Sequence, residues 1–159
     1  MLSTKDSPER EVARLEGPPA RVLVIQAPYY ADVVGGMHRG AARVLEAAGA
    51  TLETVDVAGA YELPAALRMA IRRETWEGFL LLGCVVRGAT DHYTFICDAI
   101  CHGVMDISAE TGAPLGFGLL TVDSLDQAVE RSRDDRMNKG AEAAHALLGQ
   151  LALARRWAR

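Results

Sequence analysis

Short apolar runs alternate with amphipathic segments along this chain. Residues 21–26 and 79–86 are nearly continuous in apolar side chains, which is typical of strands buried on both faces of a parallel sheet. Residues 51–57 alternate apolar and polar positions, as a strand nearer the edge of a sheet does. A glycine-containing run at residues 115–120 predicts a fourth strand.

The segments between these runs carry apolar residues at helical spacing. Gly49 ends the first of them, and Pro64 lies in the first turn of the second, where a missing N–H costs nothing. Thr90 or Asp91 can cap the third helix through a side-chain oxygen. We therefore expect helices that end near residue 48, cover 63–71 and 92–110, and run over about 124–133 and 138–156.

Strands that alternate with helices in this way predict an α/β fold. The expected architecture is a three-layer sandwich, in which a four-stranded parallel sheet with right-handed crossovers carries helices on both faces. Residues 1–19 are polar and end in Gly17-Pro18-Pro19, so we expect a flexible N-terminal arm before one domain over residues 20–159.

Composition narrows the class of protein. The chain has 159 residues and a formal net charge of −4, without a block of Lys and Arg, so no nucleic-acid partner is predicted. Its apolar runs are far shorter than the roughly 20 residues that a membrane helix needs, and its N-terminus lacks an apolar signal core. A cytoplasmic protein without a membrane partner is the expectation. Three cysteines, Cys84, Cys97 and Cys101, favour neither a disulfide framework nor a metal site.

The turn at residues 87–90 carries the first candidate chemistry. A strand that enters a helix through a glycine leaves free amides at the positive end of the helix dipole, and these bind anions. Gly88 lets a ligand approach the backbone, and Thr90 adds a hydroxyl. His92 follows in the first turn, with an ordinary pKa of about 6.5 that suits proton transfer near neutral pH. A surface histidine without a catalytic role remains the commoner alternative for such a position.

Other polar loops follow the remaining predicted strands. Ligands of parallel sheets bind beyond the carboxyl ends of the strands, where residues 28–30, 59–62 and the segment after Leu120 lie together with 87–90. These loops supply an aromatic pair, a carboxylate, a phosphate cradle and a histidine. The set suits a flat polar heterocycle and a phosphorylated small molecule.

Five motifs in register carry a resemblance to a known family. They are Gly59-Ala60-Tyr61-Glu62-Leu63-Pro64, the segment from Gly83 to Tyr93, Thr111-Gly112-Ala113-Pro114 with Phe117-Gly118, Leu120-Thr121, and the segment from Asn138 to Ala144. Together they resemble lumazine synthase, over residues 22–151. The resemblance implies a flavodoxin-like sandwich. It also implies condensation of 5-amino-6-ribitylaminouracil with 3,4-dihydroxy-2-butanone 4-phosphate, without a cofactor or a metal, in sites between neighbouring subunits of a homopentamer. Riboflavin synthase is a further partner that it suggests.

The resemblance also assigns roles by position. His92 matches the proton-transfer residue, and Ala89, Thr90 and Arg131 match the phosphate site. The residues that match the site of the pyrimidine and its ribityl chain are Tyr29, Ala60, Tyr61, Glu62, Cys84, Val85, Val86, Phe117 and Lys139. Among these residues, Phe117, Arg131 and Lys139 match positions supplied by the adjoining subunit.

This sequence departs from the family pattern at several positions. Pro28, Tyr30 and Ala58 replace a common arginine, a small polar residue and a proline, and Thr94 replaces a common aspartate after the histidine. Residues 131–137 lack the glycine- and lysine-bearing turn of members that build icosahedral shells, which favours a plain pentamer. Two other functions stay open from the sequence: a non-catalytic flavin- or lumazine-binding module, and an assembly protein.

Overall fold

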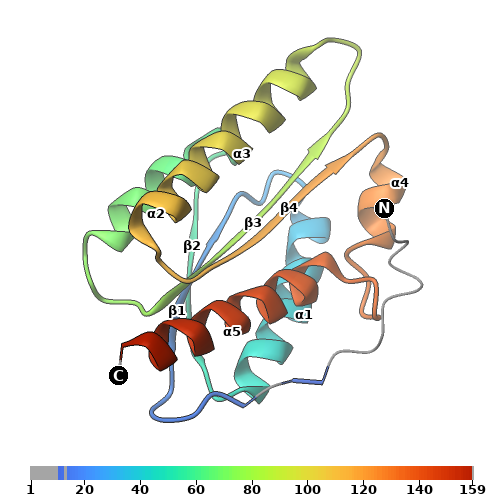
Figure 1. Ribbon diagram of the computed structural model, residues 1–159. Helices are drawn as coiled ribbons and strands as arrows, with labels where there is room; N and C mark the ends of the chain where they lie inside the picture. The colour runs from blue at the N-terminus through green and yellow to red at the C-terminus, as the bar shows by residue number, and fades with distance from the viewer. Residues whose placement is uncertain (1–10, 13, 159) are drawn as a thin grey trace.

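Four parallel strands form the central sheet of the computed structural model, which describes residues 11–12 and 14–158 (Figure 1). They are β1 (Arg21–Gln26), β2 (Thr51–Asp56), β3 (Gly78–Val86) and β4 (Leu115–Val122), in the order β2-β1-β3-β4. Every neighbouring pair is parallel. The predicted sheet is confirmed, with a flavodoxin-like strand order.

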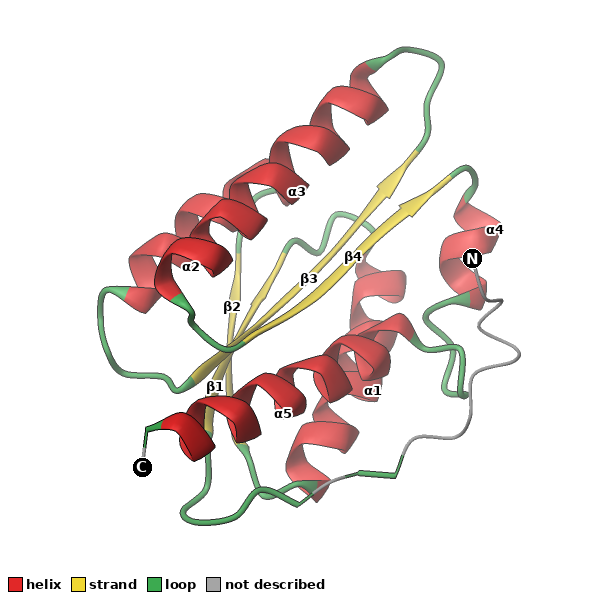
Figure 2. Ribbon diagram, viewed as in Figure 1, coloured by secondary structure: helices red, strands yellow, loops and turns green. Residues whose placement is uncertain are grey.

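Helices cover both faces of this sheet (Figure 2). One face carries α1 (Ala31–Ala47), α4 (Leu125–Glu130) and α5 (Lys139–Trp157), and the other carries α2 (Leu63–Ile71) and α3 (His92–Thr111). A short 3₁₀ helix, η2 (Ala60–Glu62), leads directly into α2. The predicted three-layer α/β sandwich is therefore confirmed.

Strand β3 joins the two halves of the core. All its residues except the last are buried, as the continuous apolar run predicts. Leu80 and Leu82 pack in the core under α1 and α5, whereas Phe79 and Leu81 pack in the core under α2 and α3. Because side chains alternate along a strand, this one segment supports both layers of helices.

The elements differ from the prediction in several details. Helix α4 ends at Glu130 instead of about residue 133, because the chain turns back so that the Lys139 N–H donates to the Arg131 carbonyl at 2.8 Å. Strand β4 runs on to Val122, paired along its whole length with β3. The N-cap residue of α3 is Asp91, yet its side chain makes no capping bond.

The N-terminal segment lies partly outside the described residues. Residues 1–10 and 13 of the expected arm are not described, so the arm stays a prediction. Just before β1, the Arg155 guanidinium donates to the carbonyl oxygens of Glu16 and Pro18 and makes a two-point pair with the Glu77 carboxylate. This arginine fixes residues 16–18 against the end of α5. No helix in the described ranges is both long and apolar enough to cross a membrane.

Candidate active site

The turn from β3 into α3 lies exposed beyond the carboxyl end of the sheet. Residues 87–92 are all open to solvent, and the Thr90 hydroxyl accepts a long 3.4 Å hydrogen bond from the His92 backbone N–H. This bond holds Thr90 at the start of α3, where the Thr94 N–H donates to the Asp91 carbonyl at 3.0 Å. The expected anion cradle and the candidate proton-transfer group therefore share one turn.

Arg87 fastens this turn to the end of β4. Its backbone N–H donates to the Val122 carbonyl at 2.8 Å, and its Nε donates to Oδ1 of Asp123 at 2.8 Å. Its guanidinium also lies 4.2 Å from the centroid of the Tyr93 ring, which is a cation–π contact. The Asp123 carboxylate raises the pKa of Arg87. These contacts set the direction in which the anion cradle opens.

The loop after β2 brings its aromatic residue to the same place. The ring centroids of Tyr61 and His92 lie 6.2 Å apart at an interplanar angle of 61°. Glu62 is exposed beside Tyr61, and Ala60 is half-buried at the start of η2. The structure therefore brings together two motifs that the sequence separates, and it leaves a free carboxylate next to them.

Tyr29 and Tyr30 form the aromatic pair after β1. Their ring centroids are 5.0 Å apart with an interplanar angle of 74°, an edge-to-face contact. Tyr30 packs partly against the core, and burial is the main cause that raises its pKa, with Cys84 and Tyr29 adding to it. Tyr29 is 79% exposed. Its ring therefore contacts the partly buried Tyr30 and keeps a face free for stacking.

The end of β3 forms the floor between these loops. Cys84 and Val85 are buried, with 6% and 9% exposure, and Val86 is half-buried. Burial raises the pKa of the Cys84 thiol to about 11, so this group is neutral at physiological pH. Its side chain packs in the core under α1 and α5, which makes it a packing group and not a nucleophile.

A second group of predicted residues lies along the free edge of β4. Phe117, Arg131 and Lys139 line one open cavity of about 470 Å³ between β4 and the start of α5. Arg131 is half-buried, and its Nη1 donates to the Gln127 carbonyl at 3.0 Å. Lys139 pairs with Glu142 at 2.7 Å. Two cations and an aromatic ring on a sheet edge suit an anionic, flat ligand.

The loop residues lie outside the cavity that the β4-edge residues line. None of Tyr29, Tyr61, Thr90 or His92 is among the residues that line the cavity with Arg131. Each group on its own offers only part of the chemistry, since one holds the histidine and the other holds the arginine. Two incomplete half-sites on separate surfaces are the arrangement expected of a site shared between copies of the chain.

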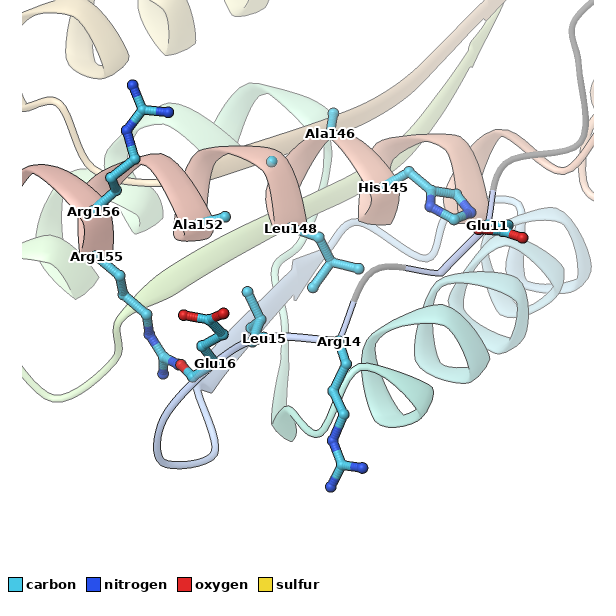
Figure 3. Close-up of a pocket in the computed structure, with 11 residues that line it drawn as sticks. Glu11, Arg14, Leu15, Glu16, His145, Ala146, Leu148, Ala152, Arg155 and Arg156 are labelled. Atoms are coloured by element: carbon cyan, nitrogen blue, oxygen red, sulfur yellow. The ribbon is translucent and has the colours of Figure 1, made fainter.

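A further cavity lies away from both groups. It measures about 700 Å³ and lies between α5 and the segment before β1, lined by residues such as Arg14, Leu148 and Arg156 (Figure 3). It contains none of the predicted site residues. Arg155, which also lines it, binds the segment that enters β1, whereas ligands of such sheets bind beyond the carboxyl ends of the strands. We therefore assign the site to the loops and not to this cavity.

Sequence reasoning gave no role to two residues that shape the site. Arg87 lies within a motif of the resemblance, but the sequence offers no sign that its partner is Asp123, because the pairing depends on β3 and β4 being neighbours. Asn138 was predicted only to open α5, yet its amide also holds the chain that carries Arg131. Only the fold could reveal these contacts.

The strand order, with helices on both faces and exposed polar loops after the strands, places the protein in the class of flavodoxin-like α/β sandwiches. Within that class, the sequence profile of the 6,7-dimethyl-8-ribityllumazine synthases matches residues 19–155, and the chain belongs to this family.

Similar proteins cover nearly the whole chain. The 6,7-dimethyl-8-ribityllumazine synthase of Kineococcus radiotolerans is 44% identical over 151 residues, which are 92% of this chain and 91% of that protein. The protein of the same name from Methylobacterium radiotolerans is 42% identical over 136 residues, 86% of this chain and 83% of its own. The one from Nitrobacter winogradskyi is 37% identical across 100% of this chain and 99% of its own.

Proposed function

We propose that this protein condenses 5-amino-6-ribitylaminouracil with 3,4-dihydroxy-2-butanone 4-phosphate to give 6,7-dimethyl-8-ribityllumazine, phosphate and water. The observation that carries the proposal is the family match over residues 19–155. The anion cradle with His92 in its first turn supports it independently, because this reaction expels phosphate and moves protons. The function belongs to riboflavin biosynthesis.

The loop half-site holds the heterocycle and the proton-transfer group in this proposal. The open face of Tyr29 stacks on the pyrimidine, and the backbone of residues 60–62 with the Glu62 carboxylate orders the ribityl hydroxyls. Cys84, Val85 and Val86 form the floor beneath the ring. Because the Cys84 side chain is buried, this floor meets the ligand through the backbone and Val86.

The phosphate lies between the two half-sites. Ala89 and Thr90 offer backbone amides and a hydroxyl at the start of α3, and Arg131 of a neighbouring copy adds charge-assisted hydrogen bonds. Phe117 and Lys139 of that neighbour face the pyrimidine. With both substrates held in place, proximity supplies several kcal/mol of the barrier reduction.

The chemistry then proceeds by simple steps. The free amine of the pyrimidine attacks the ketone, and water leaves as the imine forms. Phosphate leaves next, and the second amine closes the ring with loss of water. His92 lies within the cradle where protons move, and it assists these transfers without being indispensable to them.

Assembly is part of the proposal. Since each chain holds two incomplete half-sites, the active unit is a homo-oligomer with sites between adjacent subunits, and we propose a plain pentamer in the cytoplasm. Riboflavin synthase, which consumes the product, is the proposed partner enzyme. Light scattering of the purified protein measures the assembly directly, and a monomer would contradict shared sites.

The decisive experiment mixes the purified protein with both substrates and follows the lumazine chromophore. An enzyme-free mixture is the control, because the condensation proceeds slowly without protein. Clear acceleration establishes the synthase. Tight riboflavin binding without acceleration would instead indicate a non-catalytic binding module on the same scaffold.

A further inference from the structure

Asn138 is the most deeply buried polar side chain among the described residues, with 2% exposure. Its Oδ1 accepts a hydrogen bond from the Ala141 N–H at 3.0 Å and so caps α5. Its Nδ2 lies 3.0 Å from the carbonyl oxygen of Gly36, 3.2 Å from that of Ser132 and 2.9 Å from that of Arg133. A helix cap uses only the side-chain oxygen, so capping does not explain the three contacts of the amide nitrogen.

The amide joins α1 to the chain between α4 and α5. Gly36 belongs to α1, whereas Ser132 and Arg133 follow Arg131 directly. One NH₂ group has two hydrogens for three carbonyl oxygens, so at least one hydrogen is shared. Without this amide, the buried Ser132 carbonyl loses its donor, and the Gly36 carbonyl keeps only its helical hydrogen bond, so the link between α1 and the segment is broken and the segment is free to move.

Close packing leaves this amide no alternative position. A Cβ added at Gly40 would collide with the side chain of Asn138, and one at Gly36 would collide with the Ser132 carbonyl. Both glycines lie on the same face of α1, four residues apart. The helix therefore presents a flat backbone surface to Asn138 and Ser132, and the segment is held at a fixed distance from α1.

The two cations of the β4-edge half-site lie at the ends of the segment that Asn138 holds. Arg131 precedes Ser132, Lys139 follows Asn138, and the Lys139 N–H donates to the Arg131 carbonyl at 2.8 Å. Both side chains line the same cavity. We propose that Asn138 is a positioning residue that holds Arg131 where it meets the substrate phosphate, a role that rests on the proposed function of Arg131 as the phosphate ligand.

Substitution can separate the capping role of the Asn138 oxygen from the role of its amide nitrogen. Asn138→Ser keeps an oxygen that caps α5, so Lys139 at the first position of that helix stays in place. A hydroxyl is too short, and has too few hydrogens, to reach all three carbonyl oxygens. The segment after Arg131 then loosens while the helix start remains. Phosphate recognition should weaken, and recognition of the pyrimidine should change much less.

The test is a double-mutant cycle with inorganic phosphate as the probe, measured by calorimetry, together with the KM values of both substrates. Asn138→Ser should weaken phosphate binding about ten-fold and raise the KM of the four-carbon phosphate similarly, with the pyrimidine KM within about two-fold. If Asn138 acts through Arg131, adding Asn138→Ser to Arg131→Ala should cause no further loss. Leu151→Ala, a fully buried position farther along α5, controls for general destabilisation.

Each outcome bears on the inference. The inference would be overturned if Asn138→Ser and Leu151→Ala bound phosphate equally well. It would also be overturned if adding Asn138→Ser to Arg131→Ala weakened phosphate binding by a further ten-fold. Wild-type protein that binds no phosphate would overturn both the inference and the phosphate role of Arg131. Wild-type protein that binds phosphate but forms no lumazine would overturn the proposed reaction alone. If Asn138→Ser does not fold, the double-mutant cycle is measured with Asn138→Asp instead. Aspartate has the same shape as asparagine and keeps the capping oxygen, but it lacks the amide hydrogens.

Discussion

The rings of Tyr61 and His92 meet at 6.2 Å between centroids, although they come from loops after different strands. Tyr61 belongs to η2, which follows β2, and His92 is the first residue of α3, which follows β3. Tyr61 is therefore an aromatic neighbour of the candidate proton-transfer residue.

Replacing this histidine tests its share in the reaction. His92→Ala should slow turnover, on the order of a hundredfold, because proton transfer then relies on water. Folding should be unchanged, since residue 92 is exposed. His102→Ala, at an exposed position of the same helix, should keep the wild-type rate. A wild-type rate in the His92 variant would remove this residue from the mechanism.

Arg131 should contribute to the binding of only one of the two substrates, the four-carbon phosphate. Arg131→Ala is expected to weaken use of the four-carbon phosphate by about 2 kcal/mol, because a half-buried charged contact to phosphate is lost. Heterocycle binding should stay largely intact. Separate KM measurements for the two substrates, with the exposed Arg133→Ala as the control, test this division. An equal loss for both substrates would contradict the phosphate role.

The layer order of this fold was predictable because its signals are local. A continuous apolar run is typical of a strand buried on both faces, so β3 and the helices on both of its faces could be predicted from the sequence. Ends marked by glycine or by capping residues were also recognisable, as at Gly112, which has a left-handed φ of 63°, and at Ser124, whose hydroxyl accepts from the Gln127 N–H.

Contacts that depend on strand order were not predictable. The pair of Arg87 with Asp123 exists because β4 lies beside β3, and nothing near either residue in the chain indicates it. Likewise, α4 ends early because the chain closes back onto residues 131–133 through Asn138 and Lys139. The residue types of the site and their division between neighbouring subunits followed from the resemblance, whereas the contacts that hold Arg87 and Arg131 in place emerged only from the fold.

The buried thiol of Cys84 makes a prediction about alkaline pH. Burial raises its pKa from 9.0 to about 11, so the folded protein retains the proton that the unfolded chain releases. Its stabilising contribution is therefore fully present below pH 9.0 and is lost as the pH rises toward about 11. The expected loss is at most about 3 kcal/mol.

Unfolding in urea at several pH values measures this effect. Wild-type protein should lose stability above pH 9.0 more steeply than Cys84→Ala does. The variant carries a constant penalty for its smaller side chain, so only the difference in slope is diagnostic. Tyr30, whose pKa is also raised mainly by burial, titrates in both proteins. Parallel pH curves would contradict a buried neutral thiol.

Two glycines of α5 should respond in opposite directions to the same substitution. A Cβ at Gly140 would collide with the backbone of Met37 in α1, so Gly140→Ala should destabilise the fold by about 2–3 kcal/mol as the helices move apart. Among the described residues, no atom outside the backbone of α5 itself and the neighbours of Gly149 lies within 4 Å of a Cβ added there. Alanine also favours the helix, so Gly149→Ala should stabilise by about 0.5–1 kcal/mol. Thermal unfolding of the pair measures both. Because Gly140 follows Lys139, its variant should also weaken the β4-edge half-site, and Gly149→Ala should keep full activity. Equal shifts in the two variants would mean that α1 and α5 do not pack backbone to backbone at this point.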